Sequence, residues 1–556
     1  MTQRLVLVAK LLRGSASVLT RMITMLAIGF SCGQLSAQDS EPNSGHGDTM
    51  AKETANTIVI TTQLGEVRGV RQDDTLQFRS LPYAQPPVGD LRFLPPRKPA
   101  SWAGTLDATQ FPNRCIQPPD GGIFGQPVGK LDEDCLYLNI VTPSVEGAHR
   151  PVLFWIHGGG FTQGSANGYD GSVLATQGDV VVVTINYRLG LLGFLDLAPF
   201  GDAYSGSANN GIRDQVFALR WVQDNIADFG GDASNVTIFG ESAGGASVLT
   251  LLATPSADGL YHKAIAHSPG ATDTESSSPV SELVEHLTAA EQEVVSKLTK
   301  FSTVELLALQ EKLPGVGAAI DHVVVTRSPS EAIKDRGKAG VPLIAGTNRD
   351  EGTLFSALFA MFLGDPSSMM QGIAQSVTAG MDPKPFLDAL ATHYETTDKM
   401  VILERVFDAM FLKAAIESVT QATQAGQGGW LYQFDYATTK PLLGRDLGAT
   451  HAAEIPFTFN RFNSKSSEQI FGYDHADSVA AELAQRWSDT VIQFAKTGEP
   501  NGAGLPAWPK YEPTIRETMV LDETSRIERD LNRDLRQLWE GALADQETSA
   551  QVVDGE

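Results

Sequence analysis

Runs of apolar, β-branched residues alternate with amphipathic stretches along most of the chain. Helical periodicity separates the runs, as in residues 214–228 (DQVFALRWVQDNIAD). Apolar runs without polar alternation are typical of strands that are buried on both faces. The pattern predicts an α/β protein with a large, mostly parallel, twisted central sheet and helices on both faces. Its main strands are expected at residues 136–141, 151–156, 180–187, 236–239, 264–267, 342–345 and 430–436.

Two long segments have helical periodicity and few strand-like runs. Residues 281–312 and 366–425 are predicted to be helical insertions that lie over one end of the sheet. Another helix is predicted at residues 479–496, because the stop signal TGEPN follows it. No shift in composition divides residues 57–540, so we expect one domain there and a flexible tail at 541–556.

The N-terminal segment has the features of an export signal. Residues 1–37 contain four basic residues and no acidic ones, and the apolar core at 22–30 (MITMLAIGF) is too short for a lasting membrane anchor. The small-residue sequence LSA precedes Gln38, which predicts cleavage there and a flexible polar segment at 38–56. The protein is therefore expected to be secreted or periplasmic; an upstream start codon is the alternative.

The chain is acidic, with a formal net charge of −24 at neutral pH. Loss of the four positive charges of the leader would change this value from −24 to −28. Such a charge argues against nucleic acid and anionic membranes as partners. Because the acidic residues are spread along the chain, a solvated surface is the favoured interpretation.

The chain contains three cysteines, and Cys32 would leave with the leader. Cys115 and Cys135 are then the only pair. In an exported protein, such a pair predicts a disulfide. Closing a loop of about 20 residues would stabilise the fold by roughly 3 kcal/mol. The alternative is two free buried thiols, and no C-x-x-C spacing indicates redox or zinc chemistry.

Residues 240–244 (GESAG) match G-x-S-x-G, in which a serine occupies a sharp turn between a strand and a helix. The β-prone run 235–239 precedes this motif, and the helix-like run 246–252 follows it. The two glycines are needed because a side chain at either position would collide with the neighbouring strand or helix. Ser242 is therefore the predicted nucleophile.

A serine hydroxyl needs an imidazole as its base and a carboxylate to orient that imidazole. In proteins with this turn the chain order is serine, acid, histidine. Three histidines lie far downstream of Ser242. His393 lies inside a helical pattern and His475 lies just ahead of a predicted helix, whereas His451 follows the strand at 430–436 in a glycine-containing loop. Order and loop context favour His451.

The acid and the oxyanion hole are expected in two further loops. Asp350 and Glu351 follow the predicted strand at 342–345, and spacing alone does not choose between them. One would orient the histidine, and the other would fix the loop by accepting hydrogen bonds from backbone N–H groups. Residues 157–161 (HGGGF) follow another predicted strand, so that their N–H groups and that of Ala243 could form a three-donor cradle for an oxyanion.

With these motifs in place, the sequence resembles the type-B carboxylesterases, the cholinesterase-like branch of the α/β-hydrolases. Further blocks carry this resemblance through most of the chain and are together far more specific than G-x-S-x-G. They are LPYAQPPVG at 81–89, EDCLYLN at 133–139, NYRLG at 186–190, NGIRDQ at 210–215 and FGGD at 229–232.

The resemblance implies an α/β-hydrolase fold and a serine carboxylic-ester hydrolase that forms an acyl-enzyme and uses no metal or cofactor. It implies Ser242 as the nucleophile, Glu351 as the acid and His451 as the base. It also implies a supporting role for Ser268 and the pairing of Cys115 with Cys135. The implied oxyanion donors are the N–H groups of Gly159, Gly160 and Ala243.

Two alternatives remain beside this prediction of a small-molecule ester substrate. The same machinery could act on amide, thioester or carbamate bonds, or the fold could serve as a catalytically silent binding module. A silent module usually lacks a triad member, whereas this chain keeps all three candidates. Four aromatic residues are candidate pocket walls or ordinary core residues, namely Trp155, Phe161, Phe194 and Phe355.

Overall fold

The computed structural model describes most of the chain from Asn56 onward. The predicted signal peptide at residues 1–37 and the predicted polar segment up to residue 55 lie outside the described residues. The described residues are 56–119, 128–147, 149–313, 315–362, 365–438, 440–441, 444–462, 471–474 and 476–553.

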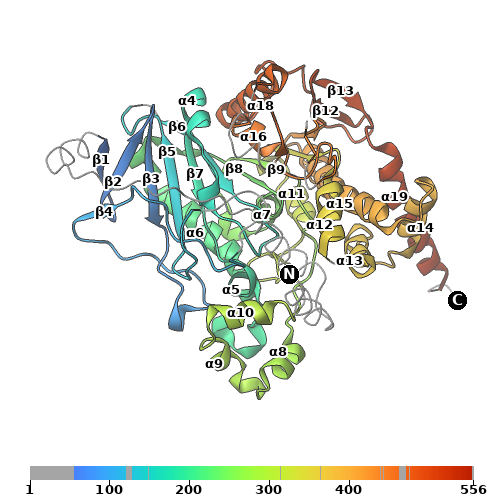
Figure 1. Ribbon diagram of the computed structural model, residues 1–556, viewed down its shortest axis with the longest axis horizontal. Coiled ribbons are helices and arrows are strands. Elements are labelled where there is room, and N and C mark those ends of the chain that lie inside the picture. The colour runs from blue at the N-terminus through green and yellow to red at the C-terminus, as the bar shows by residue number, and fades with distance from the viewer. Residues whose placement is uncertain are drawn as a thin grey trace.

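One large sheet runs through the centre of the molecule (Figure 1). Its strand order in the described chain is β1-β2-β3-β5-β7-β6-β8-β9-β10-β11-β12-β13, and β4 pairs with β2 beside this path. Every pairing from β7 to β12 is parallel, and the pairings toward both edges are antiparallel apart from that of β4 with β2. The predicted mostly parallel sheet is therefore confirmed. The strands are β1 (Thr57–Thr62), β2 (Gly65–Gln72), β3 (Thr75–Pro82), β4 (Thr105–Asp107), β5 (Tyr137–Thr142), β6 (Arg150–Ile156), β7 (Val181–Ile185), β8 (Gly231–Glu241), β9 (Lys263–His267), β10 (Leu343–Asn348), β11 (Gly429–Phe434), β12 (Glu517–Leu521) and β13 (Arg526–Arg529).

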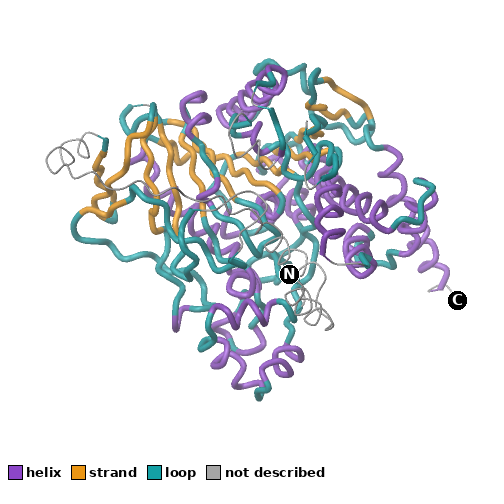
Figure 2. The backbone as a smooth tube through the Cα atoms, viewed as in Figure 1, coloured by secondary structure: helices purple, strands orange, loops and turns teal. Residues whose placement is uncertain are grey.

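Helices lie on both sides of the sheet (Figure 2). The described α-helices are α4 (Ser172–Gly178), α5 (Gly190–Phe194), α6 (Asn210–Asn225), α7 (Ala243–Leu252), α8 (Val280–Leu287), α9 (Val294–Leu298), α10 (Thr303–Gln310), α11 (Pro329–Arg336), α12 (Glu351–Phe362), α13 (Ser367–Val377), α14 (Lys384–His393), α15 (Lys399–Gln424), α16 (Ile455–Thr458), α18 (Ser478–Thr497) and α19 (Arg533–Val553).

The central strand β6 explains why the sheet is covered on both faces. Successive side chains of a strand point to opposite faces. Phe154 and Ile156 belong to the larger apolar cluster, whereas Leu153 and Trp155 belong to a second cluster on the other face. All four side chains are fully buried. The absence of polar alternation in β6 is therefore the direct result of burial on both faces.

The two segments predicted as helical insertions are helical. The first contains α8, α9 and α10, which group together beside α5 (Figure 1) and share a small apolar cluster with it. The second contains α13, α14 and the long helix α15, which packs against α12 and against β10 and β11.

The register of the parallel strands brings several loops to one edge of the sheet. Ile156 at the end of β6 pairs with Gly240, and Glu241 at the end of β8 pairs with His267. Asn348 at the end of β10 pairs with Phe434 at the end of β11. The loops that follow these strands therefore start close together, as is usual for sites in open α/β sheets.

Cys115 and Cys135 form the predicted disulfide, which joins segments 20 residues apart. Both side chains are buried. None of the described helices has both the length and the apolar character needed to span a bilayer.

Candidate active site

Ser242 occupies the junction of β8 and α7, as the motif predicts. Its backbone has φ 58° and ψ −122°, a strained conformation for a residue with a side chain. The Ser242 N–H donates a 3.0 Å hydrogen bond to the carbonyl oxygen of His267. β8 thus ends at Glu241, α7 begins at Ala243, and the serine between them is held in a sharp turn.

The glycines on either side of this turn lie where a side chain cannot fit. A Cβ atom at Gly240 would lie 2.6 Å from the carbonyl carbon of Gly244, and one at Gly244 would lie 2.0 Å from the carbonyl oxygen of Ile156. Both distances are far below van der Waals contact. The close approach of β6, β8 and α7 therefore requires the two glycines, in agreement with the sequence prediction.

Glu351 is the carboxylate that contacts His451. Its Oε2 atom lies 2.5 Å from His451 Nδ1, and its Oε1 atom accepts hydrogen bonds from Ser268 Oγ at 2.5 Å and Asn348 N at 2.7 Å. The Glu351 side chain is only 1% exposed. Three donors thus fix the carboxylate at the first residue of α12, facing one nitrogen of the imidazole.

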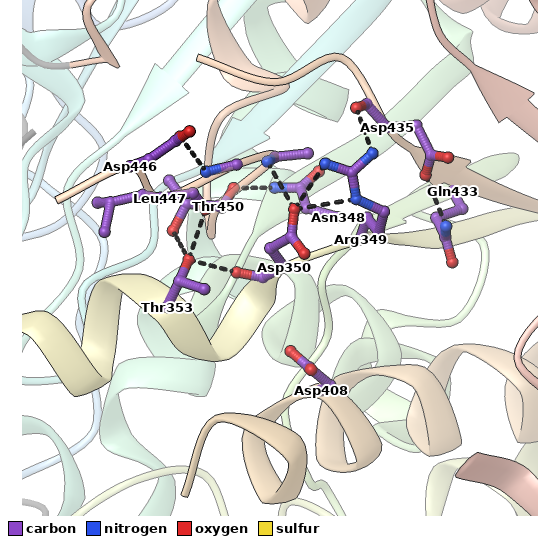
Figure 3. Close-up of polar contacts among 12 residues, drawn as sticks. Asn348, Arg349, Asp350, Thr353, Asp408, Gln433, Asp435, Asp446, Leu447 and Thr450 are labelled. Carbon is purple, nitrogen blue, oxygen red and sulfur yellow. Dashed lines mark hydrogen bonds and ion pairs between the residues drawn. The ribbon is translucent and has the colours of Figure 1, made fainter. Parts of the chain in front are cut away.

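Asp350, the other candidate, ties two loops together (Figure 3). Its Oδ2 atom accepts a 2.9 Å hydrogen bond from Ala449 N, and its own N–H donates to the Ala449 carbonyl oxygen at 3.0 Å. Arg349 Nε lies 3.0 Å from the same carboxylate. The two neighbouring carboxylates therefore have different contacts: Glu351 contacts the imidazole, and Asp350 is hydrogen-bonded to the loop that carries it.

Thr353 strengthens this connection (Figure 3). Its hydroxyl lies within 2.7 Å of the carbonyl oxygens of Asp350 and Leu447, and within 2.9 Å of the Thr450 hydroxyl. Thr450 directly precedes His451. The first turn of α12 and the histidine loop therefore behave as one hydrogen-bonded unit.

His451 lies between aromatic rings and a second carboxylate. The Phe411 ring of α15 stacks on the imidazole with the ring centres 4.7 Å apart, and Phe355 of α12 lies 4.9 Å away. His451 Nε2 is 3.0 Å from Glu241 Oε1, in an alignment that is not a hydrogen bond. Within the described chain, the Ser242 hydroxyl makes no hydrogen bond to His451. Nucleophile–base contacts are often loose in structures without substrate.

Two further buried carboxyl groups, those of Glu241 and Glu454, lie close enough to Glu351 to be affected by its charge. Burial, followed by the nearby negative charge of Glu351, raises the pKa of Glu241 well above its usual range. Burial raises the pKa of Glu454 to about 8, and Glu241 and Glu351 add to this shift. Asn348 Nδ2 donates a 2.6 Å hydrogen bond to Glu454 Oε2. At neutral pH the protonated form of Glu454 is therefore favoured.

The glycine loop after β6 provides free backbone donors. Gly159 has φ 102° and Gly160 has φ 60°, and a Cβ atom at Gly159 would lie 2.3 Å from the Gln163 carbonyl oxygen. In the described part of the protein, the N–H groups of these two glycines donate to no other group. Ala243 opens α7, where the first N–H groups of a helix lack internal partners. These three N–H groups can stabilise developing negative charge.

Ser242, His451, Gly159, Gly160 and Ala243 all line one cavity of about 620 Å³. Three of the four candidate wall aromatics, Phe161, Phe194 and Phe355, line it as well. Trp155 is an ordinary core residue, the second of the two alternatives that the sequence left open, because it shares the other face of β6 with Leu153. There its ring packs 4.7 Å from that of Phe239 and 5.0 Å from that of Phe459.

The remaining sequence candidates have other positions. His393 ends α14, and its nearest ring is that of Tyr394, its neighbour in sequence. His475 lies outside the described residues. Sequence reasoning did not single out Glu241 or Phe411, although the first adjoins Ser242 in the GESAG motif. No sequence signal marks Phe411, because only the path of α15 brings it to His451.

The sheet, the strand–serine–helix turn and the loops at the carboxyl edge together define an α/β-hydrolase. The model of the carboxylesterase family matches residues 56–539, so this chain belongs to the carboxylesterase family and is a carboxylic-ester hydrolase. The para-nitrobenzyl esterase of Bacillus subtilis (strain 168) is 36% identical over 495 residues, which cover 86% of this chain and 98% of the relative. The cocaine esterase of Homo sapiens is 34% identical over 521 residues, which cover 88% of this chain and 91% of the relative.

Solved structures agree with this family membership. A PNB esterase structure superposes with a TM-score of 0.77 at 33% identity, covering 86% of this chain and 99% of that one. An esterase from anaerobic Clostridium hathewayi, described as able to hydrolyse aliphatic aromatic polyesters, superposes with a TM-score of 0.69 at 30% identity. This superposition covers 87% of this chain and 98% of the esterase chain.

Proposed function

We propose that this protein hydrolyses carboxylic esters through an acyl-enzyme, with Ser242 as nucleophile, His451 as base and Glu351 as the acid that orients the imidazole. The observation that carries this proposal is the 2.5 Å contact between Glu351 and His451 Nδ1 beside the cavity that contains Ser242. With Nδ1 bound to the carboxylate, Nε2 is the nitrogen left to accept the serine proton.

The reaction proceeds in two halves. Ser242 Oγ attacks the ester carbonyl carbon while its proton moves to His451 Nε2, and the carbonyl oxygen becomes an oxyanion. Collapse of this intermediate breaks the bond to the alcohol, which leaves with the proton from Nε2. Water then loses a proton to Nε2 as it attacks the acyl carbonyl carbon, and collapse of this second intermediate breaks the bond to Ser242 Oγ, which takes the proton back from Nε2 as the carboxylic acid is released.

The N–H groups of Gly159, Gly160 and Ala243 are the proposed oxyanion donors. Gly159 and Gly160 donate to no protein group in the described chain, so substrate binding breaks no existing hydrogen bond at these two donors. One donor of this kind is worth about 10²–10³ in rate. Glu241 adjoins the serine, and burial raises the pKa of its carboxyl group well above the usual range.

The cavity fits an ester of drug-like size. Its volume of about 620 Å³ lies within the usual range for small-molecule sites. Phenylalanine, methionine and small residues make up most of its wall. The proposed substrate is therefore a small or medium-sized ester with apolar groups on the acyl or alcohol side.

Labelling with a fluorophosphonate tests the nucleophile directly. We expect one adduct per chain, located on Ser242 by mass spectrometry, with loss of p-nitrophenyl butyrate hydrolysis in proportion to labelling. His451→Ala should slow both labelling and hydrolysis. Stoichiometric labelling at another residue, or none at all while hydrolysis continues, would rule out this assignment.

We also propose that the protein is exported after removal of residues 1–37. The apolar core of that segment and the buried Cys115–Cys135 disulfide support this proposal. N-terminal sequencing of the protein recovered from the periplasm or medium should begin at Gln38. Recovery of the full chain in the cytoplasm would contradict export.

A further inference from the structure

The charged residues that line the substrate cavity are of one sign. Apart from His451, its charged or chargeable lining residues are Asp196 and Glu275, and the described wall contains neither lysine nor arginine. Two charges attract or repel each other more strongly inside a confined, partly apolar space than they do in water. The cavity therefore presents a negative field to whatever enters it.

Asp196 is held in place at the wall. Its Oδ2 atom accepts a 2.8 Å hydrogen bond from Ser276 Oγ, and its Oδ1 atom accepts one from Ala198 N at 3.0 Å. Its carbonyl oxygen accepts a further 2.6 Å bond from Ser278 Oγ. None of these donors is a cation, so the carboxylate keeps its charge uncompensated by these contacts.

Glu275 lies at the outer part of the same wall. Its backbone forms a bridge with Ile320, and Ser276 N donates to the Ile320 carbonyl oxygen at 2.8 Å. The carboxylate is 66% exposed and lies 3.2 Å from His322 Nε2. The backbone bridge thus fixes the segment that carries this second carboxylate at the cavity wall.

We infer that the cavity discriminates against esters that carry a carboxylate, and that Asp196 and Glu275 are the residues that set this selection. The inference rests on the proposed function, since it assumes that esters react at Ser242. It names the substrate class as uncharged or cationic esters. The carboxylic acid product would also be repelled from the cavity, which would favour its release.

A matched pair of phenyl acetates tests the selection. The probes are 4-acetoxybenzoate, which is anionic, and 4-acetoxybenzamide, which is neutral and of similar shape. Assays at pH 8.0 lie above the ordinary range of histidine titration. We expect kcat/KM for the anion to be at least tenfold lower in the wild-type protein, and to rise with added salt because salt screens repulsion.

The double variant Asp196→Asn, Glu275→Gln should raise kcat/KM for 4-acetoxybenzoate about fivefold. The value for 4-acetoxybenzamide should stay within twofold, and the salt dependence should flatten. Comparing each variant with wild type on the same probe cancels the difference in intrinsic reactivity. Asparagine at 196 can keep both side-chain contacts, because its carbonyl accepts from Ala198 N and its amide donates to Ser276 Oγ.

The control is a double variant that removes two negative charges elsewhere, Glu146→Gln with Asp224→Asn, both exposed and neither lining the cavity. If it raises hydrolysis of the anion as much as the lining variant does, selection comes from net charge and the inference is wrong. Equal wild-type rates on both probes would also overturn it. Failure of the proposed function would look different, because 4-acetoxybenzamide hydrolysis would then survive in Ser242→Ala.

Discussion

The cavity has two differently built regions: an inner end around Ser242, and an outer wall formed by α13 and the segments near residues 270–279 and 315–319. At the inner end, Cβ atoms at Gly240 and Gly244 would collide with backbone at 2.6 and 2.0 Å. At the outer wall, Cβ atoms at Gly270 and Gly372 would meet nothing within 4 Å. The backbone at the two inner glycines therefore leaves no room for a side chain, whereas these two positions of the outer wall have free space around them.

Hydrogen bonding shows the same contrast. Glu351 accepts from three donors inside the inner end, and Asp350 and Thr353 connect the two loops behind it. On the outer wall, Met369 and Ile373 of α13 contribute apolar side chains. The contrast teaches that the reacting groups need a fixed geometry. The side chains of the outer wall include none of the reacting groups and can therefore change without disturbing that geometry.

The largest contrast is expected between two serines of the same cavity. Ser242→Ala should lower kcat for p-nitrophenyl butyrate about 10⁵-fold, because no other group can form the acyl-enzyme. Ser376→Ala on α13 removes only a hydroxyl that donates to the Ile373 carbonyl oxygen, and should change kcat less than threefold. Melting temperatures should match wild type in both. A large loss in Ser376→Ala would contradict the division of the cavity into two regions.

Substitutions of the two neighbouring carboxylates, Glu351 and Asp350, should lower kcat to different extents. Glu351→Gln removes the charge that orients His451 and stabilises its cation, so kcat should fall about 10³–10⁴-fold. Asp350→Asn should act less, by roughly tenfold, since it weakens the loop connection without touching the imidazole. Steady-state kinetics and melting curves measure both. Equal losses in kcat would mean that contact with His451 does not separate the two roles.

A methyl group added to a glycine should have opposite effects at the two ends. Gly244→Ala should destabilise the protein by about 3 kcal/mol or more, because the backbone of β6 cannot move away. Gly372→Ala lies within α13 and should stabilise by roughly 0.5–1 kcal/mol. Urea unfolding measures both. A stable Gly244→Ala variant would show that the inner end is less tightly packed than these distances indicate.

Asp408, a buried carboxyl group, should make the free energy of unfolding depend on pH. Burial, despite the opposing effect of Arg405, raises the pKa of Asp408 to about 7, while the unfolded value is about 3.9. The folded state therefore binds the proton more tightly, and this contribution to stability is lost as the pH rises toward 7. From pH 5 to 7 the wild-type unfolding free energy should fall by about 2 kcal/mol relative to Asp408→Asn.

Urea unfolding at pH 5, 6, 7 and 8 measures this difference, which should become constant above pH 8. Asp388→Asn is the matched control, because that carboxylate is exposed on α14. A difference between wild type and Asp408→Asn that does not change with pH would show that Asp408 titrates alike in both states.

The smallest expected effect separates two neighbours on α15 that both line the cavity. Phe411→Leu removes the ring stacked on His451, and should lower kcat about tenfold, because the imidazole loses a packing partner that holds its orientation. Met410→Leu should leave kcat nearly unchanged and alter mainly KM. Equal kcat values in the two variants would show that the stacked ring does not contribute to turnover.

These two regions also differ in how much the sequence reveals. The GESAG turn, the glycine loop and the serine–acid–histidine order could be predicted because sharp turns and free N–H groups demand particular residues at fixed spacing. Asp350 and Glu351 could not be separated by spacing, since only the start of α12 decides which side chain faces His451. Only the resemblance to known carboxylesterases pointed to Glu351.

The outer wall and the face of each strand were harder to foresee. The wall is assembled from α13 and from segments near residues 270–279 and 315–319, none of which carries a motif. For Trp155 the sequence left wall and core open, because an apolar run does not reveal which residues point to which face. Phe411 reaches His451 only through tertiary packing of α15, more than 150 residues after Ser242 in the chain.

The parallel register has a consequence for how the enzyme gains activity. The proposed serine follows β8, the proposed acid follows β10, and the proposed histidine follows β11, so a nascent chain lacks the complete site until residue 451 has been made and its loop lies beside the end of β10. The rate of ester hydrolysis then reports the fraction of chains that have folded completely. During heating, loss of turnover should coincide with melting of the sheet, and fragments that end before α15 should be silent.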